Sequence, residues 1–177
     1  QLDFAALRRF CQDRDIPYWV EKTNIGEVVF EARQEKNPCA LCAKMRRGAL
    51  NSLAKQYGYP KVALAHHQDD VAETMLLNLF FEGRIGSFKP VTYLDRMGLT
   101  VIRPFIYVPE EQISYFTNKA ELPVSRSNCP QNCLGKRQEM KQIISQLESL
   151  APMGKDRLTG ALDRMFDGDW DGRISPK

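Results

Sequence analysis

The chain has 177 residues, of which 43% are apolar and 10% aromatic, and its formal net charge is +3. This composition predicts a globular protein with its own core and excludes disordered and fibrous classes. No apolar run approaches the roughly 20 residues that a membrane-spanning helix needs, and residues 1–10 have the pattern of an amphipathic helix rather than of a leader peptide. We therefore expect a cytoplasmic protein with no membrane partner.

The first part of the chain predicts helices and strands in alternation. Apolar residues at helical spacing predict a helix over residues 2–12, and a short strand follows over 16–20. Residues 25–35 are ambiguous and could lead as a helix into the first pair of cysteines. A helix over 40–57 ends at a glycine-containing turn, and an apolar run predicts a buried strand over 61–65.

The second part continues with a helix over 71–81, which should turn apolar residues toward the core. Segments 91–94 and 100–103 can pair as a hairpin around a Met-Gly turn. A helix over 109–120 has proline in its first turn, and a last long helix covers 134–150. The inward-facing residues of the first of these helices are expected to be Val71, Met75, Leu76 and Leu79.

The alternation of strands and helices predicts an α/β fold with a parallel sheet and flanking helices. We assign residues 1–150 to this domain, and residues 151–177 to a partly disordered C-terminal tail with one or two helical turns over 157–166. Only two strands precede the hairpin, and the first residue is not Met. Both observations lead us to expect that the domain is N-terminally truncated.

Charge is unevenly distributed along the chain. Residues 33–61 hold seven basic residues and one acidic residue, and residues 119–141 hold five basic and two acidic residues. Between them, residues 65–82 hold four acidic residues and neither Lys nor Arg. Two basic segments around an acidic loop suit a site that binds a polyanion and also performs chemistry. Ordinary solvated helix faces explain the same pattern equally well.

The segment Ala-His-His-Gln-Asp-Asp-Val-Ala-Glu-Thr, residues 65–74, follows the predicted buried strand and begins a helix. Ligands bind at that end of the strands in parallel sheets. Asp69 or Asp70 can cap the helix, with Glu73 one turn further on. Two His, two Asp and one Glu are more than capping needs, so we favour carboxylates that hold Mg²⁺ or accept a proton, beside a histidine that contacts phosphate.

The five cysteines include two close pairs, which suit metal ligands or redox thiols better than a secreted disulfide scaffold. Cys39 and Cys42 have the two-residue spacing that lets both sulfurs bind one metal. Cys129 and Cys133 form a second, wider pair. An iron–sulfur cluster, a structural zinc and a redox dithiol remain open, and the dithiol is the weakest because it leaves the second pair unexplained. Cys11 is expected in the core.

Four motifs occur in series between residues 38 and 144. They are Pro-Cys-Ala-Leu-Cys-Ala-Lys-Met-Arg-Arg-Gly-Ala-Leu from residue 38, the segment 65–74, Ile-Arg-Pro-Phe from residue 102, and Cys-Pro at 129 followed by Lys-Arg at 136. Together they resemble the tRNA 2-thiocytidine synthetase group of the PP-loop ATPases. Lysidine synthetases and tRNA 2-thiouridine enzymes are similar relatives. The resemblance implies the adenine nucleotide α-hydrolase-like fold.

The resemblance also implies an ATP-dependent tRNA thiolation. ATP would adenylate a carbonyl oxygen of an anticodon-loop pyrimidine, expected to be cytidine, and a sulfur carried on a [4Fe–4S] cluster would displace AMP. Motif matching gives Cys39, Cys42 and Cys129 as the cluster ligands, with the fourth iron open to sulfide. Cys133 departs from the family pattern. It is either a spare thiol or a fourth ligand, and a fourth ligand would occupy the iron that should bind sulfide.

The same resemblance assigns roles to the polar residues. Asp69 and Asp70 would be catalytic, assisting activation or holding Mg²⁺. The residues expected to bind nucleotide or tRNA are His67, Glu73, Arg46, Arg47, Arg103, Lys136 and Arg137, although ordinary surface charge explains each basic residue equally well. The implied partners are tRNA and a sulfur donor such as a cysteine desulfurase, and a homodimer is compatible with the sequence.

The chain departs from the family in one respect: it lacks the phosphate-binding loop of the type Ser-Gly-Gly-x-Asp-Ser, since no Gly-Gly pair occurs in the 177 residues. The backbone N–H groups of such a loop cradle pyrophosphate. We expect that the chain lacks roughly one βαβ unit, a unit of about 30 residues or more, and that this piece alone is inactive.

Two other functions remain open from the sequence. A non-catalytic zinc-binding or RNA-binding module would explain the cysteine pairs and the basic flanks. A PP-loop enzyme for another nucleobase or a small molecule would explain the motifs, since they do not identify the base pocket.

Overall fold

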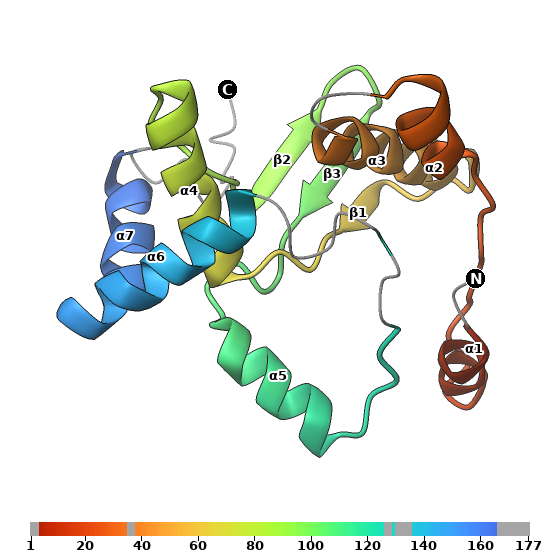
Figure 1. Ribbon diagram of the computed structural model, residues 1–177. Helices are drawn as coiled ribbons and strands as arrows, with labels where there is room; N and C mark the ends of the chain where they lie inside the picture. The colour runs from red at the N-terminus through yellow and green to blue at the C-terminus, as the bar shows by residue number, and fades with distance from the viewer. Residues whose placement is uncertain (1–3, 35–37, 126–128, 130–135, 166–177) are drawn as a thin grey trace, which may run out of the picture.

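The computed structural model describes residues 4–34, 38–125, 129 and 136–165 (Figure 1). Its sheet contains β1 (Lys61–Ala63), β2 (Val91–Leu94) and β3 (Leu99–Ile102) in the order β1-β3-β2. β1 pairs in parallel with β3, and β2 pairs antiparallel with β3. The predicted α/β class and the predicted hairpin are therefore confirmed, and the hairpin makes the sheet mixed.

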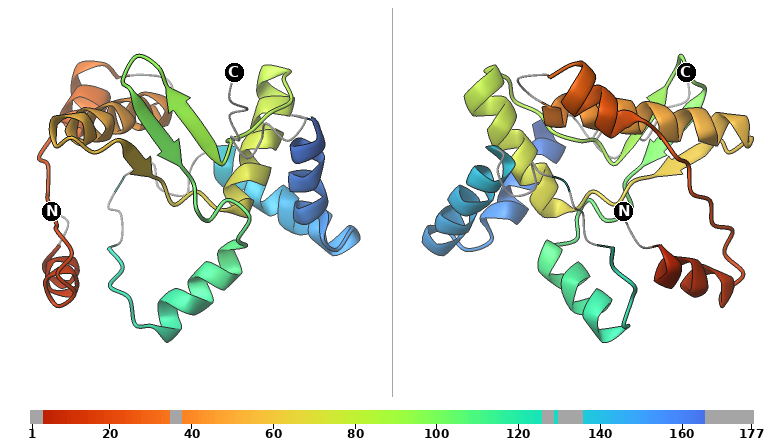
Figure 2. Two further views of the ribbon diagram at one scale, coloured as in Figure 1. Left: turned by 180° about the vertical axis from the view of Figure 1, so that it is seen from behind. Right: turned by 45° about the vertical axis from the view of Figure 1, so that its right-hand side comes forward.

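Helices lie at two sides of this sheet (Figures 1 and 2). On one side are α2 (Ile25–Glu27), the π-helical turn Val28–Ala32 and the long α3 (Pro38–Gln56). On the other side α4 (Gln68–Glu82) is in contact with both α6 (Lys136–Leu150) and α7 (Gly154–Met165). The remaining helices, α1 (Ala5–Gln12) and α5 (Glu110–Lys119), extend away from the sheet and contain no buried residue.

The core follows from the apolar positions of these elements. Val71 of α4 packs with Ile106 and Leu162, and all three are almost completely buried. A second cluster joins Ala72 and Leu76 of α4 to Met140 and Ile144 of α6. A third cluster, made by Ala54, Val62 and Leu99, joins α3 to the sheet. α4 is thus the central helix, and the start of α4 carries the polar segment singled out in the sequence.

Three sequence predictions are wrong in detail. Residues 16–20 do not form a strand, and Trp19 instead stacks on Tyr57 with ring centroids 5.4 Å apart. Cys11 is only partly buried rather than part of the core, because α1 packs few residues against other elements. Leu79 is 39% exposed, whereas Val71 and Leu76 face inward as expected.

Helix α7 forms in the segment that the sequence assigned to the tail. It covers Gly154–Met165, begins three residues earlier than the expected turns, and buries Thr159 and Leu162 against α4 and α6. Within the described residues no helix has the length and apolar character needed to cross a membrane.

Replacing Leu162 with alanine is expected to lower the free energy of unfolding by about 2 to 5 kcal/mol, because a fully buried leucine leaves a cavity where it packed. Met165→Ala on the same helix is the matched control, since Met165 is 52% exposed and its loss should change stability by no more than about 0.5 kcal/mol. Urea unfolding of the three proteins measures both values. Equal stability of the two variants would show that α7 does not pack on the core in solution.

Candidate functional site

The segment between β1 and α4 lies at the carboxyl end of a parallel strand, as the sequence predicted. The Leu64 N–H donates to the Ile102 carbonyl at 2.9 Å, which extends the pairing with β3 one residue beyond β1. The chain then turns at His66 and His67, and α4 begins at Gln68. This places the first turn of α4, with Asp69 and Asp70, at the edge of the sheet where ligands bind in α/β proteins.

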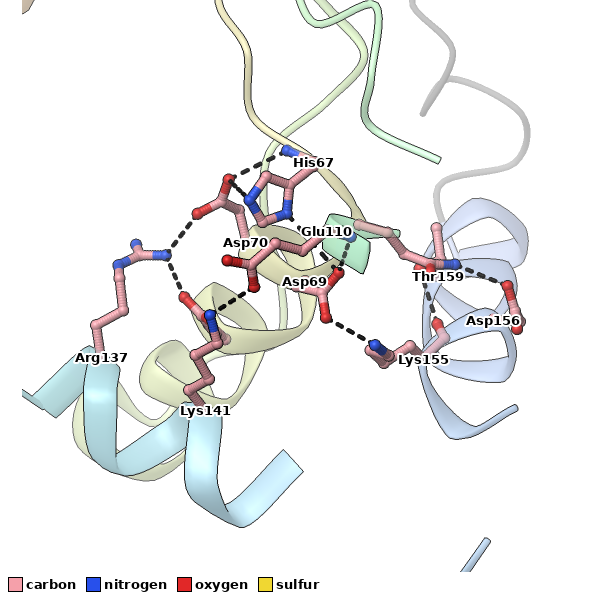
Figure 3. A network of polar contacts seen from close by, with 11 residues as sticks. His67, Asp69, Asp70, Glu110, Arg137, Lys141, Lys155, Asp156 and Thr159 are labelled. Carbon is pink, nitrogen blue, oxygen red and sulfur yellow. Dashed lines mark hydrogen bonds and ion pairs between the residues drawn. The ribbon is translucent and has the colours of Figure 1, made fainter. Parts of the chain in front are cut away.

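Asp70 closes the first turn of α4 and also faces α6 (Figure 3). Its Oδ2 accepts a hydrogen bond from the His67 backbone N–H at 3.1 Å and lies 3.4 Å from His67 Nε2. Its Oδ1 accepts from the Arg137 guanidinium at 3.2 Å, and the same guanidinium nitrogen lies 2.8 Å from Glu73 Oε2. Arg137 also donates to the Thr74 hydroxyl at 3.2 Å. One arginine therefore ties α6 to three residues of α4.

Glu73 is 4% exposed, and burial raises its pKa although the Arg137 hydrogen bond and charge oppose the shift. Asp70 adds to the rise because a second negative charge lies close by. The buried Glu73 and the partly buried Asp70 therefore share the guanidinium of Arg137. Because the Arg137 side chain is 48% exposed, another cation can compete with it for these two carboxylates.

Asp69 points away from Asp70, toward α5 and α7 (Figure 3). Its Oδ1 lies 2.7 Å from Lys155 Nζ, and its Oδ2 accepts the Glu110 backbone N–H at 2.7 Å. Burial alone would raise the pKa of Asp69, but the hydrogen bonds from Lys155 and Glu110 outweigh burial and lower the pKa. Asp69 is thus an ionised carboxylate with both oxygens engaged by protein groups.

His66 borders a cavity of about 270 Å³. Its ring stacks on Phe88 at 4.3 Å between centroids, and its buried Nδ1 has no hydrogen-bond partner among the described residues. Arg103 lines the same cavity, donates to the Lys89 carbonyl at 2.6 Å, and has a pKa lowered by burial and then by the charge of Arg47. Two guanidinium groups without a carboxylate between them favour an anion here.

A larger cleft of about 880 Å³ adjoins this cavity, and Arg47 and His66 line both. Arg46 also lines the cleft, together with the aromatic rings of Trp19, Tyr57 and Tyr59. The cleft therefore combines positive charge with exposed rings. This is the surface chemistry that binds phosphates and stacks bases of single-stranded RNA.

The predicted site residues thus fall into two groups and one outlier. Arg46, Arg47 and Arg103 border the cavity and the cleft. The acidic group at the start of α4 consists of His67, Asp69, Asp70 and Glu73, and Arg137 of α6 pairs with two of its carboxylates. Lys136 belongs to neither group, because its ammonium pairs with Glu139 at 2.9 Å and lies 5.6 Å from the Phe81 ring.

The expected metal ligands are only partly gathered. Cys39 and Cys42, with two residues between them, lie one helical turn apart on one face of α3, at its start. Cys39 is exposed and Cys42 is half-buried. Cys129 is exposed, and Cys133 lies outside the described residues. Among the residues that the structure describes, no three His, Cys, Asp or Glu side chains form a metal-binding group. The thiol pair suits two ligands of a cluster, and the described geometry does not bring in a third.

Sequence reasoning missed Lys155 and Glu110, which contact Asp69, and Lys141, which contacts Glu110 (Figure 3). It also missed the buried Gln68. Lys141 pairs with the Glu110 carboxylate, and Gln68 donates to Asp156 at 2.8 Å. A hydrophobic repeat could have indicated a packed helix after residue 153. Nothing in the sequence indicated that its lysine, Lys155, reaches Asp69.

Stability is expected to fall as the pH drops through about 6.5, the usual histidine pKa, because burial lowers the pKa of His66 while the nearby Asp70 only partly opposes this. The unfolded chain then takes up a proton before the folded chain does, so acid favours unfolding. His66→Phe should remove most of this fall between pH 7.5 and 5.5, whereas His67→Asn, which leaves His66 in place, should keep it. Urea unfolding at the two pH values measures the difference, and an unchanged fall in His66→Phe would contradict the assignment.

The chain is similar to a known domain family and to proteins of known activity. A family model described as the PP-loop domain matches residues 1–144. A tRNA-cytidine(32) 2-sulfurtransferase of Citrifermentans bemidjiense is 38% identical over 162 residues, covering 90% of this chain and 64% of that protein. The protein of the same name from Geotalea uraniireducens is 39% identical over 146 residues, covering 81% of this chain and 58% of that protein.

A solved structure has a similar fold. The U34-tRNA thiolase NcsA from Methanococcus maripaludis, with its [4Fe–4S] cluster, matches with a TM-score of 0.72 at 24% identity. The match covers 97% of this chain and 60% of that chain. This chain spans about 60% of the length of the curated relatives that it matches.

Proposed function

The chain belongs to the PP-loop domain family, and from this premise we propose that the protein containing it is an ATP-dependent tRNA thiolation enzyme. Its substrate is an anticodon-loop pyrimidine, and cytidine is the specific expectation. The observation that carries the proposal is the likeness to tRNA-cytidine(32) 2-sulfurtransferases, at 38% identity over 90% of this chain. The proposal concerns the whole protein, because this chain spans only part of the length of those relatives.

The geometry supports separate roles for the two groups of residues. The cleft and its adjoining cavity, with Arg46, Arg47 and Arg103, are proposed to bind the phosphates of ATP or tRNA. Asp70 is proposed to act on the reacting groups, because its carboxylate lies beside His67 and is paired with Arg137, whose side chain is 48% exposed. Mg²⁺ is proposed to bind at this acidic group in the presence of ATP.

A cluster of the [4Fe–4S] type is proposed to bind at Cys39, Cys42 and Cys129. When bound, it would supply the site from which sulfur is transferred. Support comes from the thiol pair on one face of α3 and from the cluster in the fold neighbour. A sulfur donor such as a cysteine desulfurase would then be needed as a partner.

Nucleoside analysis of tRNA tests the proposal. The protein as its natural gene encodes it would be reconstituted anaerobically and incubated with unmodified tRNA, ATP and sulfide. Mass spectrometry of the digested tRNA should then detect 2-thiocytidine that forms only when ATP is present. Thiolated uridine in place of 2-thiocytidine would keep the thiolation activity and overturn the assignment of cytidine. The absence of any thiolated nucleoside would overturn the proposal.

A non-catalytic zinc-binding or RNA-binding module is the second candidate, favoured by the thiol pair at the start of α3 and by the basic and aromatic lining of the cleft. Zinc at one equivalent, together with salt-dependent tRNA binding and no thiolation, would support this alternative.

A further inference from the structure

Helix α7 lies outside the residues matched by the PP-loop family model, yet it contacts the acidic group directly. The family match ends at residue 144, and α7 covers Gly154–Met165. Lys155, in its first turn, reaches Asp69 with Nζ 2.7 Å from Oδ1 (Figure 3). The two side chains are 25% and 13% exposed, so this contact is better shielded than the surface pairs of the chain.

The first turn of α7 is itself held in place from two directions. The Gly154 and Lys155 backbone N–H groups donate to the Glu148 carboxylate at 3.0 and 3.2 Å, which caps the helix from α6. Further along, Leu162 is almost completely buried against Val71 of α4. Lys155 therefore projects from a helix whose first turn is capped by α6 and whose later part packs on α4.

A second contact joins the same two helices. Gln68, which is 3% exposed, donates from Nε2 to Asp156 Oδ1 at 2.8 Å. Two successive residues of α4 thus pair with two successive residues of α7. The other carboxylate oxygen of Asp69 accepts the Glu110 N–H at the start of α5 at 2.7 Å, so Asp69 joins three helices.

We propose that Lys155 is a positioning residue for the acidic group: through Asp69 it fixes the first turn of α4 and thereby the place of Asp70 and His67. The inference rests on the proposed function and deepens it, because it assigns to α7 the alignment of the site. Both aspartates have partners at both oxygens, but Asp69 is bound by the shielded Lys155 and the Glu110 N–H, whereas Asp70 is bound by His67 and by Arg137, whose side chain is 48% exposed. We therefore assign the contact with the reacting groups to Asp70. A displacement of about 1 Å at a reacting group can reduce the rate by about 100-fold.

Kinetics of thiolation test this role with Lys155→Met, Lys155→Arg and the control Arg157→Met. Arg157 is an exposed basic residue of the same helix and should tolerate the change. Lys155→Met should lower kcat by about 10- to 100-fold and leave the KM for tRNA within about twofold of the wild-type value. Lys155→Arg retains a cation that reaches Asp69 and should regain most of the lost rate.

Stability gives a readout that does not depend on activity. Lys155→Met and Asp69→Asn should each lower the urea midpoint, and the double variant should lower it by less than the sum of the two. If the wild-type protein formed no thiolated nucleoside, the proposed function would fail, and the urea midpoints would still decide whether Lys155 holds Asp69. If the wild-type protein were active, an unchanged kcat in Lys155→Met or fully additive midpoints would overturn the inference alone.

Discussion

Replacing Asp70 with asparagine is expected to lower kcat for tRNA thiolation by about 100-fold or more, the usual contribution of a group that transfers a proton or stabilises charge in the transition state. Asparagine keeps an oxygen that can accept the His67 N–H, now 3.1 Å from Asp70 Oδ2, so the first turn of α4 should persist. The negative charge that faces Arg137 is lost. Steady-state formation of 2-thiocytidine measures the effect.

Asp95→Asn is the matched control for this change, because Asp95 is an exposed aspartate in the turn between β2 and β3. It should thiolate tRNA at the wild-type rate. Full activity of Asp70→Asn, together with a large loss in Asp69→Asn, would transfer the catalytic role to Asp69. That result would also contradict the arrangement in which Lys155 and Glu110 occupy the carboxylate of Asp69.

Replacing Cys39 with alanine is expected to abolish thiolation, with a loss of about 1,000-fold or more, because removing one thiolate ligand prevents a cluster from forming in the required geometry. The change should leave the fold intact, since Cys39 is exposed at the start of α3 and makes no contribution to the described core. Thiolation assays and urea unfolding of the same preparation separate the two effects.

Cys11→Ala provides the control, since it removes a thiol that lies in α1, away from the start of α3. It should keep full thiolation. Equal thiolation by Cys39→Ala and Cys11→Ala would mean that Cys39 takes no part in the reaction, and it would contradict the proposed cluster site.

The sequence predicted most of the helices and the hairpin because their signals are local. Apolar spacing placed α4 within three residues of its observed start, and the Met-Gly turn gave the pairing of β2 with β3. The polar segment from His66 to Glu73 was also recognised, because its residue types are unusual for a simple helix cap.

The remaining features depend on contacts between distant segments. Residues 16–20 have the composition of a strand, but strands form only beside a partner, and in the described structure Trp19 packs on Tyr57 instead. The pairing of Asp69 with Lys155 spans 86 residues, and no periodic pattern encodes it. The family resemblance implied that Arg137 binds phosphate, and it gave no sign of the pairing with Asp70 and Glu73 that the structure shows.

Sulfur transfer is proposed to start from a cluster held by three thiolates, and the visible spectrum and iron content of the protein test this most directly. The protein as its natural gene encodes it would be purified anaerobically, alongside Cys39→Ala, Cys42→Ala, Cys129→Ala and Cys133→Ala. We predict broad visible absorption and about four iron atoms per chain, lost in the first three variants and retained in Cys133→Ala. Zinc alone or no metal in the wild-type protein, or loss of the spectrum only in Cys133→Ala, would contradict the proposed site.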